Sequence, residues 1–327
     1  MTAPVPAPCA SPGLPCACPA PAAPPRATPE ARGLALGLLG VTIFALTLPM
    51  TRLAVGTPDA PLMSGLFIAM GRAAVAGLLS GALLLALRAP LPQRADWWPL
   101  VLTALGVVFG FPLLTSIAMR HVSAVHASVI VGVLPLATAA VGALLHRQRP
   151  SAAFWVCALL GTGLVVTFAM LRSGNAGLAL HPADLLLLGA MLCAAVGYGF
   201  GARLSHHMRA EFVICWALVL SLPATVPLAA LSWPAGPLPA LAWGGFAYVS
   251  VFSMWLGFFA WYRGLALGGT VRVSQVQLVQ PFLGMLFAVP LLGEGLDAVS
   301  VGFGVAVMAT VVLGRRMPVR QRPAGPR

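Results

Sequence analysis

Lysine is absent from this sequence, and acidic side chains are scarce: the 327 residues include only 7 aspartates and glutamates together. Charged residues make up 8% of the chain, against about a quarter in a soluble domain. So few charges cannot cover the surface of a water-soluble fold of this length, and that class is excluded. We attribute the use of arginine without lysine to a compositional bias of the coding sequence and base no function on it.

Long apolar runs take the place of the missing charge, and hydrophobic residues make up 59% of the chain. Each run is long enough to cross a hydrocarbon core about 30 Å thick, which takes roughly 20 helical residues. The runs are continuous and lack the alternation of barrel strands, so they predict helices. We predict an all-α polytopic membrane protein with ten transmembrane helices, at about 33–54, 62–87, 98–118, 122–145, 152–171, 184–204, 212–232, 240–262, 271–292 and 297–314.

Metal, cofactor and nucleic-acid sites also lack support. The formal net charge of +12 comes from arginines that stand singly between apolar runs instead of gathering on one face. Of the 6 cysteines, the closest pair, Cys16 and Cys18, stands in a Pro/Ala tract without a histidine at ligand spacing. We therefore expect no nucleic-acid partner, no metal and no cofactor.

The chain ends are expected to lie outside the membrane helices. Residues 1–32 are rich in proline and alanine and lack the apolar core of a signal peptide, which indicates a disordered cytoplasmic tail or a gene start placed too early. The predicted domains are this tail, a five-helix repeat at 33–171, a linker at 172–183, a second five-helix repeat at 184–314 and a basic cytoplasmic tail at 315–327.

The distribution of arginine predicts how the chain sits in the membrane. With the N-terminus in the cytoplasm, 15 of the 19 arginines fall in cytoplasmic segments and three, Arg52, Arg120 and Arg172, in outside segments. The remaining one, Arg72, falls within a span. The positive-inside rule therefore predicts a multi-pass protein of the plasma membrane (the bacterial inner membrane) with both termini cytoplasmic.

Two sequence echoes indicate that the two halves are copies of one unit. Ser128 and Pro135 recur as Ser274 and Pro281, both at a spacing of 146 residues. The segment 51–54 is echoed by 202–205 at a spacing of 151 residues, which is the same period with a short insertion. Because five helices per unit is an odd number, the two copies must enter the membrane in opposite orientations. Such inverted repeats are typical of secondary transporters, which expose one midplane site alternately to each side.

Three motifs stand in a fixed order along the membrane part. Arg72 lies in Ile68-Ala-Met-Gly-Arg-Ala-Ala74, a polar pattern ends at Pro135 with its partner ending at Pro281, and Leu291-Leu-Gly-Glu-Gly295 precedes a glycine-rich last helix. Across residues 34–314 the chain thereby resembles the drug/metabolite transporter superfamily, specifically its ten-helix EamA-like transporters. The resemblance implies export or exchange of small metabolites, amino acids or drugs by alternating access through a central cavity.

The sequence departs from the family pattern at one position. Members often carry an acidic residue at the helix end where the second repeat has Glu294, and the first repeat has Gln148 there. A role that needs both acidic residues is therefore not expected.

Candidate substrate-binding residues are the polar, aromatic and proline positions inside the spans. A charge near the bilayer centre costs about 3 kcal/mol, so Arg72 must face protein or water, either as a carboxylate anchor or as a structural arginine. The prolines either shape the cavity or only kink their helices, and the polar groups contact either substrate or other helices. The predicted substrate-binding set is Arg72, Ser128, Pro135, Tyr198, Trp255, Ser274, Gln277, Gln280 and Pro281. Trp261 and Tyr262 either stack on a substrate or anchor the eighth span at the membrane interface, and their position near its cytoplasmic end favours anchoring.

No carboxylate is expected in mid-membrane, since all acidic residues fall in the tail, in loops or at span ends. His126, the one histidine inside a predicted span, is the candidate for proton coupling, weakened by its position toward the outer end. His206 and His207 are expected in a solvated basic loop. We therefore predict facilitated or exchange-type transport, with a small-molecule substrate and the lipid bilayer as partners. A membrane-embedded receptor, scaffold or enzyme is the alternative, although the short loops offer neither a catalytic cluster nor an extramembrane domain.

Overall fold

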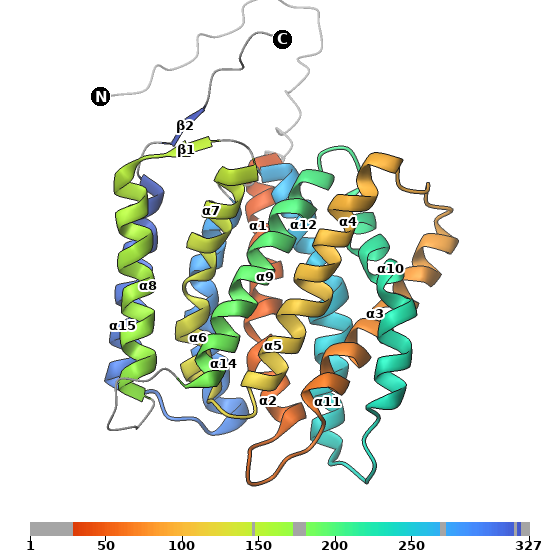
Figure 1. Ribbon diagram of the computed structural model, residues 1–327, viewed down its shortest axis with the longest axis horizontal. Coiled ribbons are helices and arrows are strands. Elements are labelled where there is room, and N and C mark those ends of the chain that lie inside the picture. The colour runs from red at the N-terminus through yellow and green to blue at the C-terminus, as the bar shows by residue number, and fades with distance from the viewer. Residues whose placement is uncertain (1–28, 146–147, 173–180, 269–272, 317–318, 322–327) are drawn as a thin grey trace, which may run out of the picture.

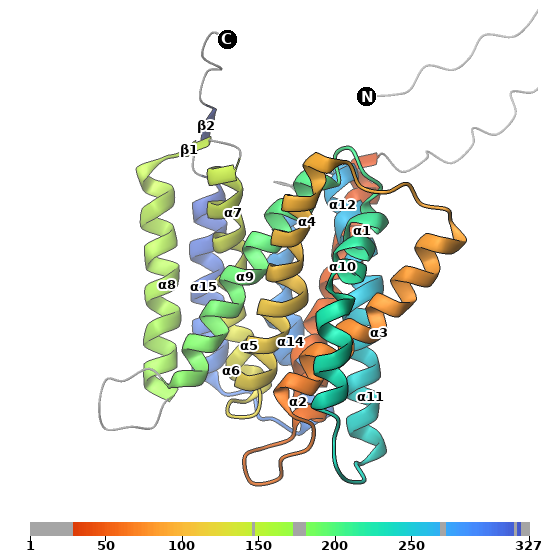
Figure 2. The ribbon, with the colours of Figure 1, turned by 45° about the vertical axis from the view of Figure 1, so that its right-hand side comes forward.

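A computed structural model describes residues 29–145, 148–172, 181–268, 273–316 and 319–321. The helices run side by side as one bundle (Figure 1). Helix α1 begins and α15 ends at the same end of this bundle, which we call the terminal end. The opposite end, which carries the loops 56–64 and 119–123, is called the far end (Figure 2). Strands β1 (Gln148–Pro150) and β2 (Val319–Gln321) pair antiparallel at the terminal end.

The helices of the first half follow the first five predicted spans. They are α1 (Pro29–Ala45), α2 (Thr47–Val55), α3 (Gly65–Ala86), the 3-10 turn η1 (Arg94–Asp96), α4 (Trp97–Thr103), the π-helix η2 (Ala104–Gly110), α5 (Phe111–Ala118), α6 (Ala124–Val131), α7 (Leu134–Leu145) and α8 (Ala152–Arg172).

The second half follows the other five predicted spans. Its helices are α9 (Pro182–Leu204), α10 (Ala210–Leu231), α11 (Ala240–Tyr248), the π-helix η3 (Val249–Leu256), α12 (Gly257–Gly268), the 3-10 helix η4 (Ser274–Val279), α14 (Gln280–Leu292) and α15 (Ala298–Arg316). The all-α prediction and the ten spans are confirmed. Helix α1 begins at Pro29, inside the predicted tail, whose residues 1–28 lie outside the described part of the chain.

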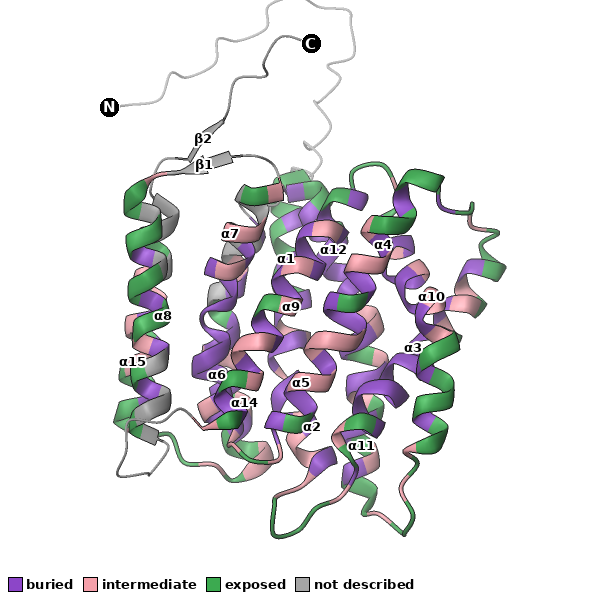
Figure 3. Cartoon of the chain, viewed as in Figure 1, coloured by how far each residue is buried: buried purple, intermediate pink, exposed green. Residues whose placement is uncertain are grey.

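Six segments are long and apolar enough to cross a membrane: Pro29–Val55, Gly65–Ala86, Arg94–Ala118, Pro182–Leu204, Ala210–Leu231 and Ala240–Gly268. The other four predicted spans hold shorter apolar helices. Many large apolar residues are exposed, and Leu85, Leu159 and Leu231 are 81%, 72% and 84% exposed. Figure 3 shows exposed positions, in green, along the outer helices. An apolar surface of this extent is stable only in contact with lipid.

Helix packing between the halves is reciprocal. Helix α3 packs on its counterpart α10 at one edge of the bundle, and α8 packs on α15 at the other (Figure 1). In the centre, α1 packs on α12 and α14, while its counterpart α9 packs on η2, α5, α6 and α7. These contacts between the halves thus come in mates with the roles of the halves exchanged, as a twofold relation between two repeats predicts.

Glycines allow the central helices to approach closely. A Cβ atom on Gly264 of α12 would lie 2.8 Å from the backbone nitrogen of Gly37 on α1, and a Cβ on Gly106 of η2 would lie 2.8 Å from that of Gly197 on α9. In lipid, where no hydrophobic force drives helices together, such backbone contact supplies the packing energy. These two contacts fix the rotation of α1 and α9, the helices that carry cavity residues.

Candidate substrate cavity and far-end vestibule

Backbone interruptions of the membrane helices meet around one central cavity. Helix α1 breaks from α2 at Leu46, the π-helices η2 and η3 interrupt the third and eighth spans, and η4 gives way to α14 at Gln280. Irregular backbone at membrane depth is tolerated where it lines a cavity, and π-helical turns occur frequently at functional sites. The cavity is lined by Phe44, Thr47, Arg72, Val107, Phe111, Ala194, Tyr198, Ser253, Phe258 and Gln280.

The free space in this cavity is about 10 Å³ as seen by the centre of a water molecule, which is room for roughly one water. Both repeats contribute to its wall. Val107 of η2 and Ser253 of η3 stand 146 residues apart, so they are equivalent positions of the two units. The structure is therefore closed around a site to which the two repeats contribute equivalent positions.

Arg72 is the charged group of the cavity and is 1% exposed. Its Nη2 donates a hydrogen bond to Ser253 Oγ at 3.0 Å, and Ser253 Oγ lies 2.7 Å from Thr47 Oγ1. Nε and Nη1 of Arg72 have no hydrogen-bond partner in the described part of the chain, and no acidic side chain there pairs with it. A buried cation with unused donors favours an anionic ligand, because a carboxylate accepts hydrogen bonds from such donors and neutralises the charge.

Two glutamines of the ninth span carry unpaired polar groups, and one of them lines the cavity. Gln280, which lines the cavity, is 7% exposed, and its Oε1 accepts no hydrogen bond in the described residues. Gln277 is buried outside the cavity lining, and neither its Nε2 nor its Oε1 has a partner in the described residues. Buried amides normally find partners, so the Gln280 oxygen is available to a polar ligand in the cavity.

Aromatic rings close the cavity toward the terminal end. Tyr198 lies 6.4 Å from Phe44 and 5.7 Å from Trp261, measured between ring centroids. Trp261 and Tyr262 are both fully buried, and the Tyr262 hydroxyl donates to Gly197 O at 3.4 Å. The assignment of Trp261 and Tyr262 to the membrane interface is wrong, because both rings fill the core between α9 and α12.

The remaining predicted site residues lie outside the cavity lining. The Ser128 hydroxyl donates to Ala124 O at 2.7 Å, a bond within its own helix. Trp255 packs against Phe259, with ring centroids 5.1 Å apart. Its indole therefore belongs to the packing around η3 instead of the cavity wall.

Both predicted prolines stand next to helix interruptions. Pro135 is the second residue of α7, directly after the break at Gly132 and Val133, and Pro281 is the second residue of α14. A Cβ on Gly132 would lie 3.6 Å from Pro281 Cγ, so the two interruptions pack on each other. The side chain of Ser274 lies outside the described residues.

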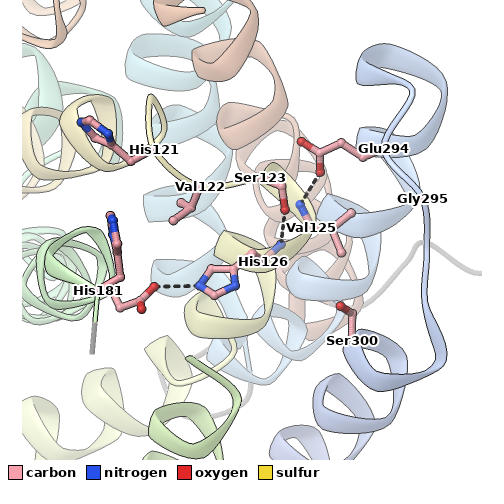
Figure 4. Close-up of a pocket in the computed structure, with 10 residues that line it drawn as sticks. His121, Val122, Ser123, Val125, His126, His181, Glu294, Gly295 and Ser300 are labelled. Atoms are coloured by element: carbon pink, nitrogen blue, oxygen red, sulfur yellow. Dashed lines mark hydrogen bonds and ion pairs between the residues drawn. The ribbon is translucent and has the colours of Figure 1, made fainter. Parts of the chain in front are cut away.

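A second hollow, the far-end vestibule, has a volume of about 480 Å³ and opens at the far end. His126 Nε2 lies 2.7 Å from Asp184 Oδ1, and this contact is one of the dashed lines at His126 in Figure 4. Glu294 accepts hydrogen bonds from the backbone N–H groups of Ala124 and Val125, each at 2.8 Å. The vestibule is lined by His121, Val122, Ser123, Val125, His126, His181, Asp184, Glu294, Gly295 and Ser300.

Sequence reasoning missed Thr47 and Ser253 in the cavity and Asp184 in the vestibule. Both Thr47 and Ser253 are polar residues inside predicted apolar spans, which is the sequence signal that could have found them. Asp184 was taken as an ordinary span-end acid, and it is 1% exposed. His207, expected in a solvated loop, lies with its Nε2 2.8 Å from Asp96 Oδ1.

These features define a polytopic membrane protein made of two related halves around an enclosed polar cavity. The sequence matches the EamA-like transporter family twice, over residues 31–170 and 181–315. It is 44% identical over 284 residues to the "Uncharacterized transporter YdeK" of Bacillus subtilis (strain 168), covering 86% of this chain and 96% of that protein. The chain belongs to the EamA-like transporter family, and it is a transporter, not an enzyme. This confirms the resemblance drawn from the motifs.

A solved crystal structure has the same fold. It superposes with a TM-score of 0.59 and is 18% identical, covering 88% of this chain and 99% of its own. At this identity the likeness concerns the fold alone.

Proposed function

We propose that this transporter exports or exchanges small carboxylate-bearing metabolites, such as amino acids or related compounds, by alternating access to the central cavity. The observation that carries the proposal is Arg72, a buried cation whose Nε and Nη1 lack partners in the described residues. A carboxylate can bind one edge of this guanidinium bidentately, through the Nη2 hydrogen that Ser253 does not use together with either Nε or Nη1, which gives both charge neutralisation and orientation. Gln280 supplies an acceptor for an ammonium group or hydroxyl of the same molecule.

The aromatic wall supports selection by the remaining part of the substrate. Tyr198, Phe44 and Phe258 present ring faces and edges to the cavity, and such surfaces accept apolar or aromatic side chains. The cavity has room for roughly one water molecule in this closed form, so substrate binding requires separation of the halves. Inverted-repeat transporters achieve this separation by rocking of one unit against the other around a fixed site.

We propose that the terminal end faces the cytoplasm and the far end faces the outside. The support is the excess of arginine in the terminal-end segments. We further propose facilitated or exchange-type transport, because the acidic residues that the structure describes lie away from the cavity lining.

A flux screen tests the proposal. Proteoliposomes are loaded with labelled amino acids, and efflux and counterflow are measured for the unchanged protein and for Arg72→Ala. Arg263→Ala is the matched control, because Arg263 is an exposed arginine at the terminal end, paired with Glu211 at 2.6 Å. We expect Arg72→Ala to abolish transport of carboxylates and Arg263→Ala to retain it. Equal transport of carboxylates by both variants would refute the anchor.

A further inference from the structure

Two histidine–aspartate bridges hold the two halves together, one at each end of the bundle. At the far end, His126 Nε2 of α6 lies 2.7 Å from Asp184 Oδ1 of α9. At the terminal end, His207 Nε2 lies 2.8 Å from Asp96 Oδ1 of η1. In each bridge one residue comes from the first repeat and the other from the second.

The far-end bridge is the more enclosed of the two. The side chains of His126 and Asp184 are 11% and 1% exposed, whereas that of His207 is 49% exposed. Asp184 Oδ2 has no hydrogen-bond partner in the described residues, although it belongs to a buried carboxylate. A buried carboxylate with one unpaired oxygen is stabilised most by a full positive charge beside it.

The start of α6 is held from two sides by the second repeat. Ser123 caps this helix within its own chain segment, with its Oγ accepting from His126 N at 3.1 Å. Glu294 of the α14–α15 connection accepts from the first two N–H groups of the helix, those of Ala124 and Val125, and Asp184 of α9 binds the His126 ring. If the halves separate at the far end, as the proposed function requires, the contact between α6 and α9 must break.

We propose that the His126–Asp184 bridge is a proton-binding site that closes the far end. The proton comes from water in the vestibule and adds to the ring nitrogen of His126 that does not face Asp184, while Nε2–H remains the donor to the carboxylate. Neutral imidazole forms an ordinary hydrogen bond to Asp184, whereas imidazolium forms a charge-assisted one, roughly twice as strong. Histidine is the side chain whose charge ordinarily changes between about pH 5 and 8. Acid on the far side therefore favours the closed form.

The other groups around the bridge include one neutral ring, two carboxyl groups and two histidines. The ring of Phe168 on α8 lies 5.1 Å from the His126 ring and carries no charge. Asp184 and Glu294 supply the carboxyl groups of the vestibule. His121 and His181 come from different halves with ring centroids 6.3 Å apart, so positive charge on both would repel and oppose closure; replacing His126 alone separates the bridge from this pair. The titratable groups lining the vestibule are His121, His126, His181, Asp184 and Glu294.

The bridge regulates a transporter without itself carrying protons across. The vestibule opens at the far end and lies apart from the central cavity, and the two share no lining residue. The rate of transport should therefore follow the pH on the far side and not the pH difference across the membrane. This keeps the inference compatible with facilitated or exchange-type transport.

The test is a distance measurement that needs no substrate. Spin labels are placed at Ala60 and Leu185, two exposed far-end positions in different halves, in an otherwise cysteine-free protein. Distances are recorded in nanodiscs at about pH 5.5 and about pH 8, on either side of ordinary histidine titration. We expect the share of the long-distance, open population to fall about fivefold at the lower pH, from the strength of a charge-assisted bond relative to a neutral one.

Two variants decide the assignment. His126→Gln keeps an N–H donor but cannot be protonated near neutral pH, so the pH response should vanish. His207→Gln removes the terminal-end bridge and should leave the response intact. Asp184→Asn should also remove the pH response. It serves as the second far-end variant in case His126→Gln does not fold.

An unchanged response in both far-end variants, or a single distance at both pH values in the unchanged protein, would overturn the inference. Neither result would touch the Arg72-dependent flux on which the proposed function rests. Conversely, a distance that responds to pH without Arg72-dependent flux would support the role of the His126–Asp184 bridge and refute the proposed substrate class.

Discussion

Replacing Arg72 by methionine should separate substrate binding from folding. The guanidinium forms one hydrogen bond to a protein side chain, to Ser253 Oγ at 3.0 Å, and keeps Nε and Nη1 for a ligand. Two charge-assisted hydrogen bonds at about 1.5 kcal/mol each or more imply a loss of at least about 3 kcal/mol. The dissociation constant for a carboxylate substrate should therefore rise about 100-fold or more.

The free energy of unfolding of Arg72→Met should rise or stay unchanged, although its substrate affinity falls. Arg72 is 1% exposed and has no acidic partner in the described residues, so burying its charge costs free energy that a carboxylate repays in the bound state. Methionine fills similar volume without a charge, and such replacements are neutral or stabilising by about 1–4 kcal/mol. Arg72→Lys keeps the charge but loses the planar fork, and it should bind with intermediate affinity.

The assay compares each substrate with its decarboxylated amine. Affinities are measured by calorimetry in nanodiscs and by counterflow, and thermal unfolding is followed in the same preparation. We expect Arg72→Met to lose discrimination between acid and amine while its melting temperature is retained or raised, and Arg263→Met to change neither. Discrimination that survives in a well-folded Arg72→Met protein would refute the role of this arginine.

Three further outcomes follow from the packing. Gly264→Val should lower the melting temperature by an amount corresponding to about 1–3 kcal/mol or more, since a Cβ there would meet backbone at 2.8 Å, while Gly236→Ala, with nothing within 4 Å, should not. Glu294→Ala removes the acceptor of two backbone N–H groups, costs about 1–2 kcal/mol, and should enlarge the open far-end population measured by spin-label distances. Ser253→Ala should weaken substrate binding several-fold in calorimetry because it frees the cavity arginine from its one side-chain partner. Ser250→Ala, whose hydroxyl bonds only to Phe246 O, should bind normally, and equal binding by both serine variants would contradict the assignment.

The candidate site was only partly predictable from the sequence. Arg72 was identified because a lone charge inside an apolar run is conspicuous in any sequence. Tyr198 and Gln280 were identified as aromatic and polar positions inside spans, and the structure places both in the cavity lining. Ser128 and Trp255 carried the same kind of signal and lie outside that lining, because Ser128 faces Gly284 of α14 and Trp255 packs against a cluster of α3 and α10 residues.

Sequence alone determined the membrane class, the ten helices and the repeat, because hydrophobicity sums locally along each segment and the echoes recur at a constant period. Tertiary structure decided which polar groups meet. The cavity brings together three residues that are far apart in the sequence, Thr47, Arg72 and Ser253. They meet because glycine contacts set the rotation of α1 and because helix breaks turn the backbone toward the centre. Asp184 reaches His126 for the same reason: where a span-end carboxylate points depends on which helix packs beside it.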